Sequence, residues 1–497
     1  MKRKKKSTQK PLNLIPSKSE QLAAFQPMLS ADEFAVLQIE VEKTLPPALR
    51  INPLKAPADL AKALSKRYGW TLTPIPFCKE GYRVQVNDGP AVSAALEHRT
   101  GQYYIQEAAS MLPVALFDVH GEEKGLTLDL AASPGGKTTH IVARQNDRGL
   151  VLANDSSQGR IQALKVVLQH WGATNTAVTR FAGEKFGSWF PNTFDRALID
   201  APCSMQGLRT AESHDERPVT DKESRLLAQR QTALLVSALQ AVKVGGQVVY
   251  STCTLLPGED EGVVEAVLSK FGHAVELVDV SPKLPQPAPG IQQLDGHPYQ
   301  ADMSRVVRLW PHRYQTAGFF ACLLQKTGDL DLKTLEPPTH SMEAAGFSEL
   351  TYSESEKFAR DFKSWTGYDL SIYLQEHQRT LVKRDARLFL FPRLLLEQFR
   401  SLPVQSAGML LGEWEGDAFI PSHEWVLRFG AQCVDCLITL ENELFAEFIR
   451  GDDLMGYVDG VNAKTEIRVV IDRQGRVVGR GRMMADRLKN LSSRHLR

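Results

Sequence analysis

Short apolar runs alternate with amphipathic stretches through the middle of the chain. A long helical pattern over residues 221–244 separates the last two of these runs. The runs lie at residues 126–132, 149–155, 176–181, 197–200 and 247–252. Alternation of this kind predicts an α/β domain built on a doubly wound, parallel sheet. Two further runs, at 306–310 and 318–324, predict a closing β-hairpin.

The segments on either side of this region have different patterns. Residues 30–45 carry apolar side chains at steps of three and four, and Ser30 with Glu33 forms a capping box, so a helix is expected there. Short strand patterns separated by turns fill the C-terminal part. We therefore expect four parts: an N-terminal α+β domain at 1–120, the central domain at 121–328, a linker with a mixed α/β module at 329–404, and a β-rich module at 405–497.

The composition excludes several classes of protein. With 43% hydrophobic and 24% charged residues, the chain is globular, and no apolar run reaches the roughly 18 residues of a membrane span. Six cysteines in 497 residues do not form a disulfide framework. The first ten residues are basic but lack the apolar segment of a secretory signal. We therefore expect a reducing, cytoplasmic location.

Basic residues are concentrated at both ends of a chain whose net charge is only +1. Residues 2–10 contain six Lys and Arg and no acid, and residues 464–497 contain ten Lys and Arg against three acids. Such ends favour a polyanionic partner such as RNA. For the N-terminal arm, a solvated end without a partner is an equal alternative. The C-terminal cluster lies in strand-like sequence, which favours contact with RNA.

A glycine-rich turn follows the first predicted strand, in the sequence AASPGGKT. The phosphate-loop motif needs a glycine five residues before Gly136, and that position is Ala131, so this motif is absent. The turn still allows a small ligand to approach the backbone. Asp155 lies 19 residues after Gly136, a spacing typical of a carboxylate that binds a ribose. These features fit a methyltransferase or another nucleoside-binding sheet equally well.

Two cysteines follow neighbouring predicted strands. Cys203 and Cys253 both lie at the carboxyl edge of the predicted sheet, where open α/β folds bind ligands. A single buried cysteine is usually inert, but a pair at this edge, with Asp200 on the same strand end as Cys203, predicts covalent chemistry. A nucleophilic thiolate needs electropositive surroundings, and Lys137 is the candidate cation.

Several runs of the sequence together carry a family resemblance. LDLAASPGGKTTH, LIDAPCS and VVYSTCTL occur in this order, with RINPLK and YIQEAASMLP before them and RLWPH and AGFFA after them. Through these runs, residues 126–326 resemble the catalytic domain of the Sun-type RNA (cytosine-5) methyltransferases, which use S-adenosyl-L-methionine. The β-rich end resembles the PUA-like module of one bacterial branch, the ribosomal small-subunit methyltransferase F group. The resemblance implies a Rossmann-like class I methyltransferase sheet.

The resemblance also implies roles for individual residues. Cys253 would attack carbon 6 of the cytosine, Cys203 would release the product, Asp200 would hydrogen-bond the ring near N3 while protonated, and Lys137 would orient the base or the cofactor. The residues implied in cofactor binding are Ala131, Ala132, Ser133, Pro134, Gly135, Gly136, Lys137, Asp155 and Asp200. The expected partner is RNA, either ribosomal RNA or the small ribosomal subunit. We expect no metal and a monomer.

The chain departs from the family pattern at four positions. Ala182 stands where an aspartate is expected beside the adenine, and Met205 and Gln206 stand in a usual Gly-Glu-Gly run. Asp260 replaces the asparagine of a usual Glu-Asn-Glu run. Ala182 and Met205 keep a non-catalytic RNA-binding assembly factor open as an alternative function, and a transfer-RNA substrate also stays open. An amino-methyltransferase is disfavoured, because Asp200 begins Asp-Ala-Pro-Cys and not an Asn/Asp-Pro-Pro-aromatic run.

Other polar residues have weaker signals. Arg50 and Lys55 fit contacts with RNA phosphate and plain surface charge equally well. Cys433 and Cys436 form a single C-x-x-C pair without a second pair nearby, which does not predict zinc binding. Arg160 lies on an amphipathic helix pattern and is expected to form a structural ion pair.

Overall fold

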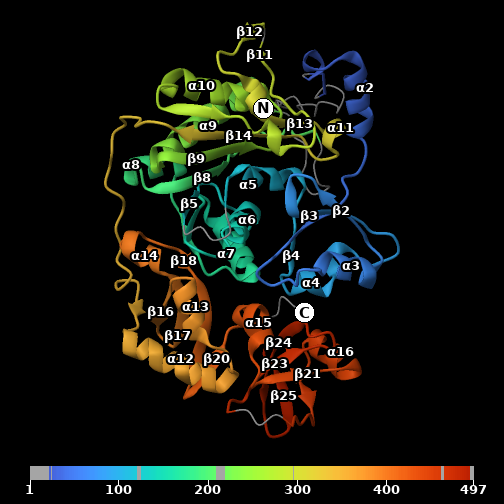
Figure 1. Cartoon of the computed structure of the whole chain (residues 1–497), viewed down its shortest axis with the longest axis vertical. Coiled ribbons are helices and arrows are strands. Elements are labelled where there is room, and N and C mark those ends of the chain that lie inside the picture. The colour runs from blue at the N-terminus through green and yellow to red at the C-terminus, as the bar shows by residue number, and fades with distance from the viewer. Residues whose placement is uncertain are drawn as a thin grey trace, which may run out of the picture.

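A nine-stranded sheet forms the centre of the molecule in the computed structural model (Figure 1). The structure describes residues 22–492 except 24, 120–124, 209–218, 295 and 461–463, so the basic arm at 2–10 lies outside the described residues. The strand order is β10-β14-β9-β8-β5-β6-β7-β18, and β13 pairs with β14. The bounds are β5 (Leu126–Asp129), β6 (Leu150–Asn154), β7 (Thr176–Thr179), β8 (Phe194–Asp200), β9 (Val242–Thr252), β10 (Val275–Val278), β13 (Val307–Leu309), β14 (Phe319–Lys326) and β18 (Ser406–Ala407).

The direction of the strands confirms the predicted doubly wound sheet. Strands β5 to β9 run parallel to one another, whereas β14 runs antiparallel to both β9 and β10, and β18 runs antiparallel to β7. The chain moves outward from β5 through β6 to β7 and then returns to β8 on the other side of β5. This change of direction between β5 and β8 opens a crevice at their carboxyl ends, the usual ligand site of such sheets. The predicted hairpin is also confirmed, because β13 and β14 pair antiparallel.

Helices cover both faces of this sheet. Successive residues of the buried strands point to opposite faces: Leu198 and Val249 belong to one apolar core with α5 and α6, and Ile199 and Val248 belong to another with α9 and α10. The bounds are α5 (Leu112–Leu116), α6 (Gly136–Arg144), α7 (Gln158–Trp171), α8 (Phe186–Trp189), α9 (Asp221–Ala241), α10 (Glu261–Phe271) and α11 (Pro311–Tyr314). None of the helices in the described ranges is long and apolar enough to cross a bilayer.

A four-stranded antiparallel sheet forms the N-terminal domain, which lies beside the central sheet in Figure 1. Its order is β2-β3-β1-β4. Its elements are α2 (Ala31–Glu40), β1 (Ala48–Ile51), α3 (Leu60–Tyr68), β2 (Thr71–Ile75), β3 (Cys78–Gln85), α4 (Leu96–Arg99) and β4 (Tyr103–Ile105). The capping box of Ser30 and Glu33 is present, although the helix ends at Glu40 and is shorter than the pattern predicts.

Two five-stranded sheets make up the C-terminal part, with orders β15-β16-β17-β19-β20 and β21-β23-β24-β25-β22. The bounds of their strands are β15 (Ser348–Glu349), β16 (Arg379–Arg384), β17 (Arg387–Pro392), β19 (Met409–Glu415), β20 (Ala418–Pro421), β21 (Leu437–Thr439), β22 (Leu454–Met455), β23 (Ile467–Ile471), β24 (Val477–Met483) and β25 (Arg487–Asn490). A separate two-stranded sheet of β11 (Gln293–Leu294) and β12 (His297–Pro298) lies earlier in the chain, between β10 and β13. Helix bounds are α12 (Tyr352–Thr366), α13 (Leu370–Glu376), α14 (Arg393–Gln398), α15 (His423–Phe429) and α16 (Asn442–Arg450).

The strand pairing corrects one predicted boundary. Strand β17 pairs with β19, so one sheet continues across the division expected between residues 404 and 405. Phe391, Leu395 and Phe399 also belong to the apolar core under the central sheet. We keep the four-part division as a proposal but place this boundary after β20. The local sequence did not reveal the pairing because the linker between β17 and β19 contains a helix and a turn.

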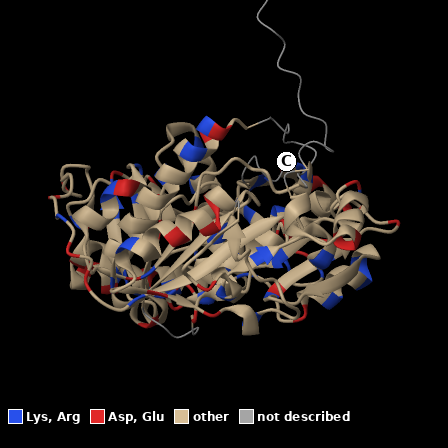
Figure 2. Ribbon diagram, turned by 90° about the horizontal axis from the view of Figure 1, so that it is seen from above, with Lys and Arg blue, Asp and Glu red and all other residues tan. Residues whose placement is uncertain are grey.

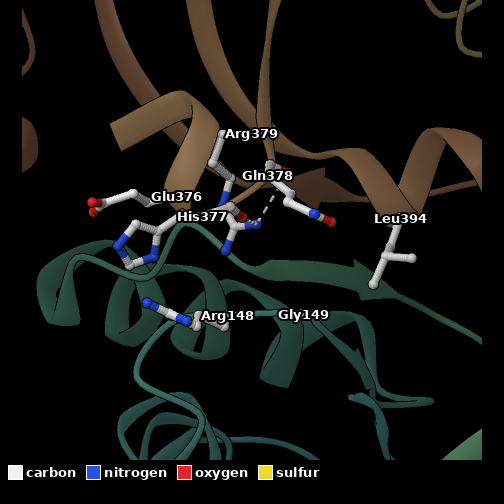
Figure 3. A pocket seen from close by; sticks show the side chains of 7 residues that line it. All are labelled: Arg148, Gly149, Glu376, His377, Gln378, Arg379 and Leu394. Atoms are coloured by element: carbon white, nitrogen blue, oxygen red, sulfur yellow. Dashed lines mark hydrogen bonds between the residues drawn. The ribbon is translucent and has the colours of Figure 1, made fainter. Parts of the chain in front are cut away.

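A buried carboxylate joins the C-terminal part to the central domain. Asp147 accepts hydrogen bonds from Thr174, Tyr373 and Arg428, and its backbone carbonyl accepts one from Arg379. Figure 3 shows the adjoining boundary, where His377, Gln378 and Arg379 face Arg148 and Gly149. Burial alone would raise the pKa of Asp147, but the charges of Arg428 and Arg379 outweigh it and lower this pKa to about 2.

We expect Asp147→Asn to destabilise the protein by about 3–5 kcal/mol at neutral pH, because it leaves two buried guanidinium groups without their countercharge. Urea unfolding measures this loss. The folded-state pKa of Asp147 is below its ordinary value, so its contribution is complete above about pH 4 and disappears as the pH falls toward 2. Asp118→Asn, which removes an exposed partner of Lys283, serves as the control and should cost less than about 1 kcal/mol. Equal losses of stability in Asp147→Asn and Asp118→Asn would contradict the role of Asp147 as a buried countercharge.

Candidate active site

The two predicted thiols lie together at the carboxyl ends of β8 and β9. These strands are parallel neighbours with Asp200 opposite Ser251, so the residues just beyond them meet at one edge of the sheet. The Sγ atoms of Cys203 and Cys253 are 3.2 Å apart. Both side chains are only partly buried at this edge. The sequence therefore predicted correctly that the two thiols share one crevice.

The two thiols have unequal proton affinities. A hydrogen bond from the Cys203 thiol lowers the pKa of Cys253, and the positive charge of Lys137 lowers it further against the effects of burial and of Asp200. The same hydrogen bond and burial raise the pKa of Cys203 well above its ordinary value. The arrangement therefore favours a thiolate on Cys253 and a thiol on Cys203. A thiolate is the nucleophilic form of cysteine.

Lys137 and Asp200 face each other beside the thiols. The Nζ of Lys137, in the first turn of α6, lies 2.7 Å from Oδ2 of Asp200 at the end of β8. Ser251 donates a hydrogen bond of 3.1 Å to the other carboxylate oxygen of Asp200. Lys137 also lies 5.4 Å from the ring centroid of Phe319. The four residues predicted as catalytic, Lys137, Asp200, Cys203 and Cys253, are thus brought to one place.

The glycine-rich turn connects β5 to α6 next to Asp155. Gly135 has φ +115°, and a Cβ there would lie 2.9 Å from Cγ1 of Val167 on α7, so this position requires glycine. Asp155 accepts hydrogen bonds from the backbone N–H groups of Ser133 and Ser157. Arg160 lies 3.6 Å from Asp155, which is the structural ion pair expected of it. Each carboxylate oxygen of Asp155 accepts one of these hydrogen bonds, which leaves one lone pair on each oxygen.

Sequence reasoning missed Asp129, the last residue of β5. One of its carboxylate oxygens accepts a hydrogen bond of 2.7 Å from Thr138. The other, Oδ1, is buried without a hydrogen-bond partner among the described residues. Burial raises the pKa of Asp129 to about 7. The sequence pattern could have indicated Asp129, because it is an acidic residue at the end of the first strand of the sheet, where the strand order reverses. An unsatisfied buried acceptor beside the glycine turn suits the cationic groups of S-adenosylmethionine, so the residues present fit this cofactor.

Arg50 supports the same turn from the N-terminal domain. Its guanidinium donates hydrogen bonds to the carbonyl of Gly136 (2.9 Å) and to the hydroxyl of Thr139 (2.7 Å), and it lies 4.5 Å from the ring centroid of Trp171. Arg50 has no exposed surface, and Lys55 donates to the carbonyls of Thr100 and His170. For Arg50, full burial contradicts both a contact with RNA phosphate and plain surface charge. Lys55 is only partly buried, and its possible contact with RNA stays a prediction. Both residues hold the two domains together.

The loop after Cys253 is fixed by a buried arginine. Arg308 donates a hydrogen bond of 2.9 Å to Glu261 and one of 3.3 Å to Asp260, and all three side chains are fully buried. Thr252 donates a hydrogen bond of 2.6 Å to Asp260. Burial raises the pKa of Asp260 well above its ordinary value, and the side chain of aspartate has nearly the same shape as that of asparagine. The departure at Asp260 therefore preserves the loop.

The remaining departures have different consequences. Met205 has φ +61°, a left-handed conformation that costs a residue other than glycine roughly 1–2 kcal/mol and that explains why glycine is usual there. Its side chain is 44% exposed, so it fits without a clash. The carbonyl of Gln206 accepts a hydrogen bond from the backbone of Leu255. Ala182 is exposed and presents no polar group to a ligand.

Basic residues of the C-terminal cluster are paired with acids. Arg482 lies 2.7 Å from Glu415, and Arg487 lies 3.3 Å from Asp453. Figure 2 shows Lys and Arg interspersed with Asp and Glu over the molecule. Among the described residues, the positive charge predicted at this end is thus partly neutralised within the protein.

Comparisons with known proteins identify related chains. A family described as "16S rRNA methyltransferase RsmB/F" matches residues 115–325, and one described as "N-terminal domain of 16S rRNA methyltransferase RsmF" matches residues 19–108. Ribosomal RNA small subunit methyltransferase F of Shewanella oneidensis is 32% identical over 486 residues, 97% of this chain and 96% of that protein. Its counterpart in Aeromonas hydrophila is 32% identical over 482 residues, 96% and 95% of the two chains.

A solved structure extends the likeness to three dimensions. A methyltransferase homologue from Pyrococcus horikoshii has a TM-score of 0.54 and 29% sequence identity, and the match covers 63% of this chain and 100% of that one. The match supports the predicted methyltransferase sheet.

Proposed function

The chain belongs to the family of ribosomal RNA small subunit methyltransferase F, and from this premise we propose that it transfers a methyl group from S-adenosyl-L-methionine to carbon 5 of a cytosine in 16S ribosomal RNA. The observation that carries the proposal is the contact of 3.2 Å between the thiols of Cys203 and Cys253, beside the Lys137–Asp200 pair. Two thiols at the carboxyl edge of a cofactor-binding sheet match the two cysteines of this chemistry.

The first step is addition of the Cys253 thiolate to carbon 6 of the cytosine. Carbon 5 is a poor nucleophile until this bond forms, because the ring electrons reach it only in the resulting enamine. Asp200, the ion-pair partner of Lys137, must take up a proton from solvent at this moment, so that it can donate a hydrogen bond to N3 and stabilise the charge that the addition places on the ring. Its position at the end of β8, close to Cys253, suits this role. S-adenosylmethionine supplies the methyl group as an electrophile on its sulfonium.

The second step is release. After methyl transfer, carbon 5 carries both a methyl group and a proton, and this proton must leave so that the bond to Cys253 can break. The hydrogen bond to Cys253 is the main cause of the raised pKa of Cys203, and it is lost once the sulfur of Cys253 is bonded to the ring. Cys203, whose sulfur touches that of Cys253, then gives its own proton to solvent, and its thiolate removes the proton from carbon 5. Elimination then restores the aromatic ring and returns the electron pair to the sulfur of Cys253. Lys137 holds Asp200 in position through its contact of 2.7 Å.

We also propose residues for binding the cofactor and the RNA. The turn from Ala131 to Gly136 and the carboxylates of Asp129 and Asp155 hold the cofactor at the crevice between β5 and β8. The N-terminal domain and the PUA-like C-terminal module bind the RNA backbone. The target base has to leave any stack to reach Cys253.

The proposal is tested by nucleoside analysis after reaction with labelled S-adenosylmethionine. We expect 5-methylcytidine at one position of 16S ribosomal RNA, offered as free RNA and as small ribosomal subunits, with less than about one hundredth of that label in transfer RNA. Bisulfite sequencing locates the position. If labelled 5-methylcytidine appears in transfer RNA alone, the substrate is transfer RNA and not 16S ribosomal RNA. If the label appears on adenine, the protein is not a cytosine-5 methyltransferase. RNA binding without any methyl transfer or cofactor binding would leave the assembly-factor alternative.

A further inference from the structure

Three side chains with metal-binding chemistry meet at the boundary between the N-terminal domain and the central domain. Cys78 and Glu80 lie on β3, and His140 lies on α6. The Sγ of Cys78 is 3.7 Å from Oε2 of Glu80 and 3.8 Å from Nε2 of His140, and Nε2 lies 3.8 Å from the same Oε2. The three atoms therefore form a nearly equilateral triangle. Cys78 and His140 are fully buried, and the Glu80 side chain is 13% exposed.

We propose that Cys78, Glu80 and His140 bind a zinc ion that joins the N-terminal domain to the catalytic domain. A thiolate, an imidazole and a carboxylate are the side chains that bind zinc. With metal–ligand bonds of about 2.0–2.3 Å, two ligands of a tetrahedral ion lie roughly 3.3–3.7 Å apart. The observed triangle reaches this size when each edge shortens by a few tenths of an ångström. A water completes the coordination, as in zinc sites with three protein ligands.

The charges balance when the ion binds. The Cys78 thiol loses its proton to solvent, and the resulting thiolate with the Glu80 carboxylate neutralises the two charges of the zinc ion, while His140 binds as a neutral ring. Arg144, whose Nη2 lies 3.5 Å from Oε2 of Glu80, is the main competing cation. Oε2 is also the oxygen that would bind the ion, so Arg144 has to move to the second oxygen, Oε1, when the ion binds. A carboxylate that binds a metal through one oxygen keeps its second oxygen for such a hydrogen-bond donor.

The place of the cluster gives the ion a structural role. His140 lies one turn along α6 from Lys137, and the same helix begins at the glycine-rich turn. Arg50 already ties the N-terminal domain to this turn through Gly136 and Thr139. An ion bound to β3 and α6 holds the two domains together a second time. This role is separate from methyl transfer, because Cys203 and Cys253 take no part in it.

Cobalt titration of the full-length, metal-free protein in a thiol-free reducing buffer tests the proposal. We expect one equivalent of Co²⁺ to bind with a thiolate-to-cobalt charge-transfer band and the visible bands of a tetrahedral ion, to release about one proton, and to be displaced by Zn²⁺. Cys78→Ser should lose the charge-transfer band, and His140→Gln should bind cobalt at least about tenfold more weakly. Cys322→Ala and His98→Gln, which change a buried cysteine and a histidine outside the cluster, should bind like the wild type.

Two outcomes overturn the proposal. If the folded wild-type protein binds neither ion at micromolar concentration, the triangle is only a hydrogen-bonded cluster. If the charge-transfer band survives in Cys78→Ser, the cobalt lies on Cys203 and Cys253 or on Cys433 and Cys436. Should the variants fail to fold, as judged by circular dichroism, X-ray absorption of the zinc-loaded wild type decides. One sulfur among the ligands supports the site, and two sulfurs overturn it.

Discussion

Replacing Cys253 by alanine is expected to lower the rate of methyl transfer by about 10⁴-fold or more while leaving RNA and cofactor binding intact. Without the Cys253 thiolate to add to carbon 6, carbon 5 of the cytosine has no nucleophilic character. Single-turnover transfer of labelled methyl groups measures the rate. Equilibrium binding of RNA and of S-adenosylmethionine shows whether the affinity for both is unchanged.

RNA containing 5-azacytidine gives a second readout for this variant. The wild-type protein should form a covalent complex with such RNA that survives denaturing electrophoresis, and Cys253→Ala should form none. Cys322→Ala is the matched control, because Cys322 is buried in β14 of the same sheet, away from the crevice, and it should keep activity within about twofold. A covalent complex in Cys253→Ala would move the nucleophilic role to another residue.

The Cys203→Ala variant is expected to accumulate the intermediate that the wild type resolves. The Cys253 adduct still forms on ordinary RNA, but without Cys203 the carbon 5 proton leaves slowly and the bond to Cys253 persists. We expect turnover to fall by about 10²–10⁴-fold and a protein–RNA complex to appear in denaturing gels. Rapid turnover without such a complex would remove Cys203 from the release step.

The Cys203→Ala substitution affects both the release step and the pKa of Cys253, and the pH dependence of adduct formation separates these two effects. The hydrogen bond from Cys203 is the main cause of the lowered pKa of Cys253, so its loss raises that pKa. A raised pKa means that less thiolate is present at a given pH, and the profile of adduct formation in Cys203→Ala should therefore shift to higher pH. Cys203→Ser retains a hydroxyl donor, and its profile should lie between those of Cys203→Ala and the wild type.

The central sheet and the catalytic crevice were predictable because their signals are local. Each strand is an apolar run followed by a turn, and each of the four predicted catalytic residues stands at the end of such a run or at the start of the helix after it. Parallel strands bring these ends to one edge regardless of the sequence between them. The meeting of Cys203 and Cys253 thus follows from their place after the strands, although 50 positions separate them.

The contacts between domains were not predictable, since their partners lie far apart in the sequence. Arg50 stands between Leu49 and Ile51, and nothing near it in the sequence indicates that Gly136, Thr139 and Trp171 surround its guanidinium. Asp147 likewise lies in a turn typical of an exposed loop, yet Arg379 and Arg428 reach it from more than 200 positions away. A sequence shows which residues carry a charge, but not whether they are buried or which residues they contact. Burial and contacts determine the role of an arginine.

The short strand β18 has a consequence for the behaviour of the protein in solution. Ser406 and Ala407 pair with β7, and the backbone N–H groups of Gln405 and Gly408 donate to the carbonyls of Val178 and Thr176. Without this segment, β7 would be the outermost strand of a parallel sheet with open hydrogen-bonding groups, which is the kind of edge at which chains aggregate. A segment from the far end of the chain therefore closes the edge. Until it has been synthesised, the growing chain exposes a strand that can pair with its neighbours.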